Sequence, residues 1–250
     1  MLLLITSVTR WFSYYLITLV TYIIPHHIEH YIFRNTFHTT YRWMRLWSIT
    51  SLWAFGAKLY LVNNSEEDYE SGKQYIWTGN HRSWIDHFCI FKYSLNPTHI
   101  FLNEKFAKVF LFGRTCLLSG SIPVDKGSLS LKSKKKLINN LKEKHSLCLF
   151  FEGTRGQGKE LLPFRKGAFH FSMKNKVPLK PFFLFNTENI ASKNRNFFDI
   201  RPCDIFLVLE NSWQFTEENF DKEVEEFQKY YKTKYDELYL KYAKELPVCD

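Results

Sequence analysis

Short apolar runs alternate with segments of helical length from about residue 74 to the end of the chain. This alternation restricts the fold more than any other feature, because strands separated by helices form a parallel sheet with helices on its faces. We therefore predict an α/β domain with a mostly parallel central sheet flanked by helices. The expected strands are 74–78, 98–102, 117–124, 147–151, 179–186 and 204–210, and the expected helices are 86–94, 128–144, 166–175 and 216–244.

The N-terminal segment Leu2–Ile24 is apolar except for scattered Ser and Thr and one charge, Arg10. Its uncharged part begins only at Trp11 and is shorter than the ~20 residues that a membrane-spanning helix needs. An arginine within a span adds about 2.5–3.5 kcal/mol to the free energy of insertion. The segment could span the bilayer if Arg10 extends to the interface, or it could lie within one leaflet. A cleaved signal peptide is disfavoured, because no small-residue cleavage site follows.

A second N-terminal segment, Tyr41–Val62, has Trp and Leu side chains at helical spacing with Arg and Lys between them. This pattern predicts an amphipathic helix that lies in the headgroup layer; an ordinary core helix is the alternative. The chain turns polar at Asn63, and we place a boundary there. Residues 1–62 are thus predicted to be a pair of membrane-associated helices, and residues 63–250 a separate domain.

The charge balance limits the possible partners. The 34 Lys and Arg exceed the 25 Asp and Glu, which gives a formal charge of +9. Basic chains bind polyanions, such as nucleic acid, anionic lipid or phosphorylated small molecules. No nucleic-acid motif is present, so we expect no nucleic-acid partner. The high aromatic content, 18%, also favours a lipid–water interface.

The five cysteines occur singly, and three histidines cluster near the N-terminus. Neither group has the context of a metal site, and scattered cysteines indicate reduced thiols facing a cytosol rather than disulfides. We therefore expect no metal ion and interpret the three histidines as interfacial side chains. The residues concerned are Cys89, Cys116, Cys148, Cys203, Cys249, His26, His27 and His30.

A histidine motif follows the first expected strand of the sheet. It reads Asn80-His81-Arg82-Ser83-Trp84-Ile85-Asp86. Asp86 falls in the first turn of the next expected helix and can fold back toward His81. A carboxylate on one ring nitrogen fixes the tautomer and leaves the other nitrogen as a general base. The alternative is a helix-capping aspartate beside an unrelated surface histidine.

A second motif follows the strand expected at 147–151. It reads Phe150-Phe151-Glu152-Gly153-Thr154-Arg155. Its glycine lets backbone N–H groups approach an anion, its threonine offers a hydroxyl, and its arginine offers a fork that suits phosphate. Taken alone, the pattern could also be a surface turn with an ion pair.

The two motifs, in this order and about seventy positions apart, resemble those of the glycerolipid acyltransferases. The similarity is greatest to the 1-acylglycerol-3-phosphate (lysophosphatidate) acyltransferases. Asn80, His81, Ser83 and Asp86 stand in the family's first block. The second, third and fourth blocks are represented by residues 120–126, 150–155 and 177–182. The resemblance covers about residues 75 to 186 and makes 63–250 the acyltransferase domain.

The resemblance implies a role for each matching residue. His81 would take the proton from a lysolipid hydroxyl, and Asp86 would orient its ring. The hydroxyl oxygen would then attack the thioester of acyl-CoA or acyl-carrier protein, without a metal, a cofactor or a covalent acyl-enzyme. The residues that would bind the acceptor are Asn80, Ser83, Lys126, Glu152, Gly153, Thr154 and Arg155.

Four positions depart from the family pattern. Phe151 replaces a proline, and Lys126 replaces an arginine, which exchanges a planar fork for a point charge. Asn103 stands where the family often has lysine, and Lys180 interrupts an otherwise apolar fourth block. These departures concern the identity of the acceptor more than the reaction.

We therefore expect acyl transfer to lysophosphatidic acid, giving phosphatidic acid, by a membrane-associated protein of phospholipid biosynthesis whose active site faces the cytoplasm. Its expected partners are a lysophospholipid, an acyl thioester and membrane lipids, with acyl-carrier protein as a possible protein partner. The acceptor could instead be another lysophospholipid or glycerol 3-phosphate.

Two other classes of function are weighed against acyl transfer. A lipid hydrolase would use Ser83 or Ser119 as nucleophile, but Ser83 is not on a Gly-x-Ser-x-Gly elbow. A basic protein that binds RNA or membranes without catalysis is the remaining alternative.

Overall fold

A computed structural model describes residues 2–34, 37–66, 72–125, 129–192, 196 and 198–243. These residues form one seven-stranded sheet of order β1-β7-β6-β2-β5-β3-β4. All neighbouring strands are parallel except β6 and β7, which confirms the predicted mostly parallel sheet. The strands are β1 (Lys58–Asn63), β2 (Ile76–Gly79), β3 (Thr98–Asn103), β4 (Ile122–Val124), β5 (Ser146–Cys148), β6 (Leu179–Phe185) and β7 (Asp204–Leu209).

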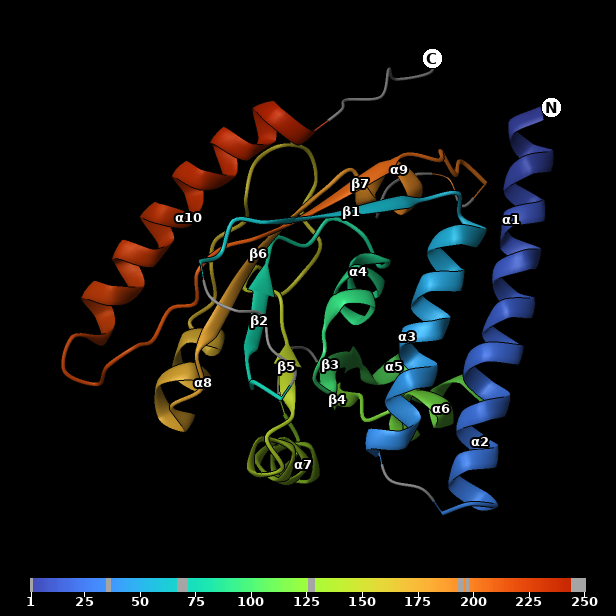
Figure 1. Cartoon of the computed structure of the whole chain (residues 1–250), viewed down its shortest axis with the longest axis horizontal. Helices are drawn as coiled ribbons and strands as arrows, with labels where there is room; N and C mark the ends of the chain where they lie inside the picture. Colours follow the sequence, from blue (N-terminus) through green and yellow to red (C-terminus); the bar gives the residue numbers. More distant parts are fainter. Residues whose placement is uncertain are drawn as a thin grey trace.

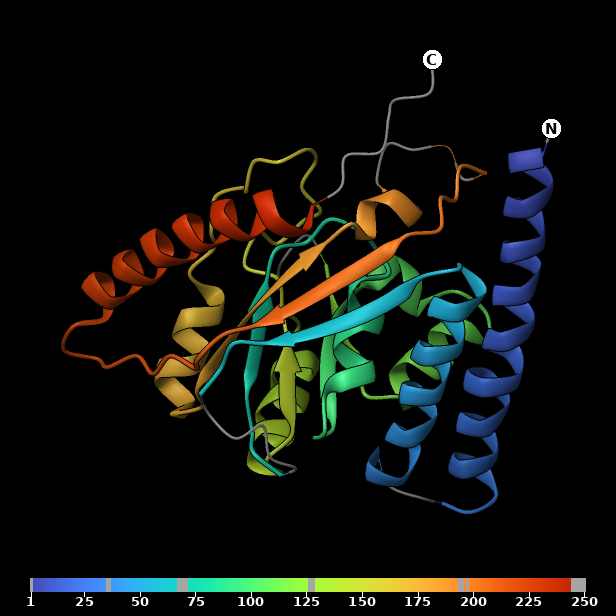
Figure 2. The same ribbon diagram turned by 45° about the horizontal axis from the view of Figure 1, so that its top comes forward.

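Helices cover both faces of the sheet (Figures 1 and 2). One core packs α3 and α4 against the sheet around Phe88 and Phe91, and another packs α8 and α10 around Phe169 and Phe227. Strands β2 and β6 are therefore buried along their whole length. The helices are α1 (Leu2–Thr18), the π-helix η1 (Leu19–Ile23), α2 (Ile24–Tyr31), α3 (Phe37–Ala54), α4 (Asp86–Tyr93), α5 (Glu104–Ala107), α6 (Phe112–Leu118), α7 (Leu131–Lys142), α8 (Gly167–Asn175), α9 (Thr187–Ala191) and α10 (Phe220–Tyr242).

The N-terminal helices α1, η1 and α2 run in one line along the side of the domain opposite α10 (Figure 1). Their inner face joins the core: Trp11 stacks on Trp84 with 5.9 Å between ring centroids, and Tyr22 stacks on Trp47 at 4.0 Å. Their outer face is apolar and exposed, at Leu3, Leu4, Ile5, Val8, Phe12, Tyr15, Leu16, Leu19, Val20, Ile24 and Ile28.

Two expected elements are wrong. The helix expected over Tyr41–Val62 ends at Ala54, because Gly56 takes a left-handed φ of +72°, and residues 58–63 form strand β1 beside β7. The strand expected over 117–124 begins only at Ile122. Leu117 and Leu118 end helix α6 instead, since a short apolar run has no period that separates helix from strand. The division at residues 62 and 63 stays a prediction.

Candidate active site

His81 lies two residues after the end of β2, and Asp86 begins α4. His81 Nδ1 lies 2.7 Å from Asp86 Oδ2, so the contact expected from their spacing is present. The same carboxylate oxygen accepts the backbone N–H groups of Arg82 at 2.8 Å and Ser83 at 3.0 Å. Asp86 is fully buried, whereas the side chain of His81 is 20% exposed. The carboxylate holds the proton on Nδ1 and thus leaves the Nε2 lone pair as the basic site.

The loop after β5 supplies one wall for the imidazole. The ring of Phe150 stacks on His81 with 3.9 Å between centroids and an angle of 11° between planes. Phe150 in turn meets Phe182 of β6 edge to face. The ring of His81 is therefore fixed by a hydrogen bond at one edge and by an aromatic plane on one face.

The two motifs meet because β2 and β5 are adjacent parallel strands, whose carboxyl ends lie at the same sheet edge. The backbone N–H of His81 donates to Glu152 Oε1 at 2.9 Å. The backbone N–H of Gly156 donates to the His81 carbonyl at 2.8 Å. The turn at 152–156 thus hydrogen-bonds both the N–H and the carbonyl of His81. Arg155 precedes Gly156, the residue that donates to this carbonyl.

Glu152 is buried and accepts several hydrogen bonds from groups around His81. Its Oε1 accepts His81 N–H, and its Oε2 accepts Leu162 N–H at 2.9 Å and Arg82 Nη1 at 3.3 Å. The guanidinium of Arg82 is also buried, and its Nη2 donates to the Glu160 carbonyl at 2.9 Å. Glu152 therefore fixes the backbone on which His81 stands, and its predicted contact with the acceptor stays a prediction.

Arg155 belongs to the turn at 152–156, and Arg165 approaches it from outside. Gly153 has a φ of +68°, and a side chain there would begin 2.5 Å from Arg165 Nε, so Arg165 lies over the glycine. The Arg165 N–H donates to the Phe151 carbonyl at 2.8 Å, which fixes this approach. Thr154 is exposed and Arg155 half-buried. Arg165 therefore places a positive charge at the turn, and the predicted contact of Arg155 with the acceptor stays a prediction.

Other predicted site residues have mainly internal bonds. Asn80 joins β2 to β6, since its Nδ2 donates to the Leu184 carbonyl at 2.7 Å and its Oδ1 accepts Leu184 N–H at 2.8 Å. Ser83 Oγ donates to the Ala191 carbonyl at 2.5 Å. Their contacts with substrate stay predictions. Lys126 lies outside the described residues.

The hydrolase alternative gains no support from the described residues. Ser119 is buried and its Oγ lies 2.7 Å from the hydroxyl of Tyr22, and Ser83 bonds a carbonyl. Neither hydroxyl is hydrogen-bonded to His81 in the described part of the chain, so no serine–histidine pair is formed there.

Two tyrosines of α10 contribute support that the sequence did not predict. The Tyr231 hydroxyl accepts Asn80 N–H at 2.9 Å and donates to the Phe182 carbonyl at 2.7 Å. The Tyr235 hydroxyl accepts Arg82 Nη2 at 3.3 Å, and burial raises the pKa of Tyr235 to about 12. The residues on both sides of His81 are therefore tied to one helix. The only sequence signal was their helical spacing, which any buried stripe shares.

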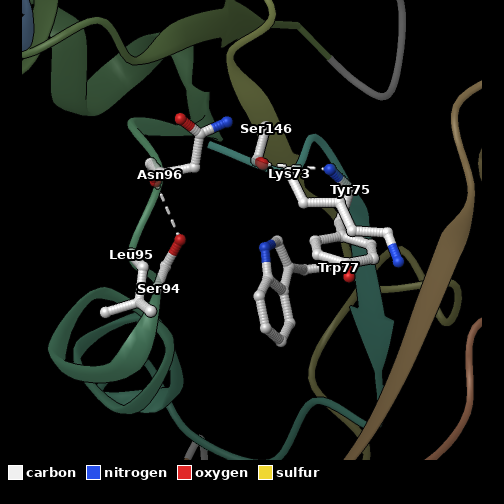
Figure 3. Close-up of a pocket in the computed structure, with 7 residues that line it drawn as sticks. All are labelled: Lys73, Tyr75, Trp77, Ser94, Leu95, Asn96 and Ser146. Carbon is white, nitrogen blue, oxygen red and sulfur yellow. Dashed lines mark hydrogen bonds between the residues drawn. The ribbon is translucent and has the colours of Figure 1, made fainter. Parts of the chain in front are cut away.

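A small hollow lies elsewhere in the sheet (Figure 3). Its lining includes Tyr75, just before β2, and Trp77, whereas His81 follows the end of that strand. Hydrogen bonds cross its rim from Tyr75 N–H to Ser146 Oγ at 3.0 Å and from Ser94 Oγ to the Asn96 carbonyl at 2.9 Å. We therefore assign this hollow no part in the site around His81.

Known proteins resemble this chain in sequence and fold. Residues 61–184 match the family model described as Acyltransferase. The chain is 31% identical over 148 residues to the 1-acyl-sn-glycerol-3-phosphate acyltransferase of Saccharomyces cerevisiae, covering 57% of this chain and 48% of that protein. It is 29% identical over 131 residues to the Escherichia coli protein of the same name, covering 51% and 54%. The chain thus spans about half the length of the curated relatives that it matches.

A crystal structure titled the 1-acyl-sn-glycerophosphate (LPA) acyltransferase, PlsC, from Thermotoga maritima has the same fold. The TM-score is 0.74 at 18% identity, over 96% of this chain and 98% of that one. The resemblance found in the motifs is thereby confirmed. Residues 61–184 of this chain are a domain of the Acyltransferase family.

Proposed function

We propose that this protein transfers a fatty acyl group from an acyl thioester to the free hydroxyl of lysophosphatidic acid, giving phosphatidic acid. The observation that carries the proposal is the His81–Asp86 pair, whose backbone is bonded to a glycine turn that contains Arg155 and lies under Arg165. The names of the relatives from yeast and E. coli support the same reaction.

In the proposed mechanism, His81 Nε2 takes the proton of the acceptor hydroxyl while the hydroxyl oxygen attacks the thioester carbonyl. The new C–O bond forms, the C–S bond breaks, and the imidazolium returns its proton to the leaving thiolate. Asp86 stabilises the imidazolium through the 2.7 Å contact with Nδ1. A positioned base of this kind contributes roughly 10²–10⁴-fold to the rate. The acceptor's own hydroxyl is the nucleophile, so the proposal needs no cofactor, metal or acyl-enzyme.

We assign the phosphate of the acceptor to the turn at Gly153. Arg155 and Arg165 would neutralise its charge, and Lys126 is proposed as a third cation. Glu152 is assigned to positioning, because its oxygens already accept hydrogen bonds from His81 N–H, Leu162 N–H and Arg82. The donor is acyl-CoA or acyl-carrier protein.

We also propose that the enzyme lies on one leaflet, with the site toward the cytoplasm. The helix over Leu3–Tyr31 is long and apolar enough to cross a membrane. However, it touches the domain along its length: Ser7 Oγ accepts Ile200 N–H at 3.3 Å, and Arg10 donates to the Ala54 carbonyl at 3.3 Å. A helix held against a polar domain in this way favours an in-plane position, with its outer apolar face in the lipid.

The test is transfer by purified protein with lysophosphatidic acid, other lysophospholipids and glycerol 3-phosphate, and with both donor types. We expect phosphatidic acid as the main product and a loss of at least about a hundredfold in rate for His81→Ala. Product identification by mass and a thermal unfolding curve of the variant complete the experiment. Near-normal turnover by a folded His81→Ala protein would remove the proposed base.

A further inference from the structure

The loop between α5 and α6 presents apolar side chains to solvent. Phe110, at its tip, is 88% exposed. Arg114, in the first turn of α6 after the loop, donates from Nε and Nη2 to the Tyr31 hydroxyl at 3.2 and 3.1 Å, so the start of α6 lies against the end of α2. The exposed apolar residues of the loop and of the end of α2 are Phe106, Val109, Phe110, Leu111, Tyr31, Ile32 and Phe33.

The backbone holds this tip in one arrangement. Leu111 has a φ of +58°, which is unfavourable for a residue with a branched side chain. Gly113 packs so tightly that a side chain there would begin 2.3 Å from the Ala107 carbonyl oxygen. The Gly113 N–H also donates to the Val109 carbonyl at 2.7 Å. The fold thus maintains an unfavourable turn that exposes Phe110 instead of burying it.

Positive charge surrounds the apolar tip. Lys105, Lys108 and Arg114 are exposed, and Glu104, which pairs with Lys108 at 3.0 Å, is the one acidic residue between positions 104 and 114. Exposed aromatic and aliphatic side chains with a basic rim are typical of surfaces that enter the headgroup region of anionic bilayers. Helix α5, which precedes the loop, begins directly after β3, and β3 runs parallel to β5 and β2. The segment therefore starts from the sheet edge that carries His81.

We propose that the segment of residues 105–114, which is the loop with the adjoining parts of α5 and α6, is a second membrane-contact element that inserts Phe110 into the interface of a bilayer containing anionic lipid. The occupant is a lipid surface because the tip continues the exposed apolar side of α1 and α2 through the contact of Arg114 with Tyr31. The inference rests on the proposed function only in placing the enzyme at a membrane. An acidic carrier protein is the other chemistry that would suit a basic apolar tip, and the test separates the two.

The first experiment places an environment-sensitive fluorophore on the full chain at Phe110→Cys. The matched control is Leu240→Cys, because Leu240 is 82% exposed and belongs to α10, a helix on the other side of the domain from α1 and α2 (Figure 1). Vesicles are either phosphatidylcholine alone or an equimolar mixture with phosphatidylglycerol, and cosedimentation records binding in the same samples. We expect a blue shift, and quenching by lipids with a nitroxide on the acyl chain, at position 110 and at neither the control nor the unsubstituted chain.

The second experiment measures partitioning of variants onto the mixed vesicles. Phe110→Ser should weaken it roughly tenfold, since the ring loses its apolar burial, while Leu240→Ser should not change it. Lys105→Gln should reduce binding to anionic vesicles about fivefold. The Phe110→Ser protein should keep its thermal unfolding midpoint, because the ring is exposed.

Three results would overturn the proposal. A probe at position 110 that stays in water while the chain sediments with vesicles would exclude insertion. If Phe110→Ser partitions onto vesicles unchanged but no longer transfers acyl groups from acyl-carrier protein, while transfer from acyl-CoA is kept, the tip would be a binding surface for the carrier protein instead. Failure of the full chain to sediment would remove every membrane contact proposed here. A shifted probe on a protein that transfers no acyl group would refute the proposed reaction and leave the loop assignment standing.

Discussion

Replacing Glu152 by Gln separates positioning of His81 from binding of the acceptor. The carboxylate accepts three hydrogen bonds from groups of the two motifs and the loop that follows: His81 N–H, Leu162 N–H and Arg82 Nη1. An amide retains one acceptor oxygen and places an NH₂ group against a donor. It also leaves the buried guanidinium of Arg82 without its counter-charge.

The expected magnitude follows from these contacts. Breaking a buried ion pair by removal of one charge costs about 3–5 kcal/mol, and Arg82 keeps carbonyl partners, so we expect the lower end. For a chain of this size, about 3 kcal/mol lowers the unfolding midpoint by roughly 6–12 °C. We also expect kcat to fall by roughly tenfold or more, because His81 loses its fixed backbone, while KM for the acceptor changes little.

The assay is steady-state transfer with varied acceptor, together with thermal unfolding of the same samples. Glu160→Gln is the matched control, because it removes an equal charge from an exposed side chain in the same loop. A Glu152→Gln protein with an unchanged unfolding midpoint and kcat, but a raised acceptor KM, would refute the positioning role and return Glu152 to the phosphate site.

Three further predictions concern other parts of the molecule. Arg155→Ala should raise the acceptor KM about tenfold with a smaller effect on kcat, and an unaltered acceptor dependence would exclude Arg155 from the phosphate site. Burial lowers the pKa of Lys136 from 10.5 to about 8. Between pH 8 and 10.5 the folded protein therefore binds fewer protons than the unfolded chain, so the free energy of unfolding should rise with pH in this range. Lys136→Met should remove that rise in urea unfolding curves; an identical pH profile would contradict it. Phe12→Ser with Leu16→Ser should weaken vesicle cosedimentation without lowering the unfolding midpoint, because both side chains are exposed.

Much of the fold was predictable because the strands of the central sheet are short, apolar and separated by helices. The His81–Asp86 contact was also predictable, since a five-residue step from a strand end into a helix start brings the two side chains together. The edge strand β1 was not predictable, because Lys58–Asn63 continues the amphipathic pattern of the preceding helix and only Gly56 interrupts it.

The supports of the site were less predictable than its chemical groups. Residue type identified Glu152 as part of the motif, but its bonding to His81 N–H, Leu162 N–H and Arg82 depends on how the turn folds over β2. The contacts of Tyr231 and Tyr235 join positions about 150 residues apart. A single sequence holds no local signal for contacts of that separation.

Strand β7 lies between β1 and β6, although it is added to the sheet late in the chain. A fragment trimmed to the segment that matches the family model would end at residue 184, within β6. Such a fragment would leave β1 with no neighbour to pair with and would open the backbone of β6 to water. An independently folding piece of this chain must therefore extend at least through β7, well past the last sequence motif of the candidate site.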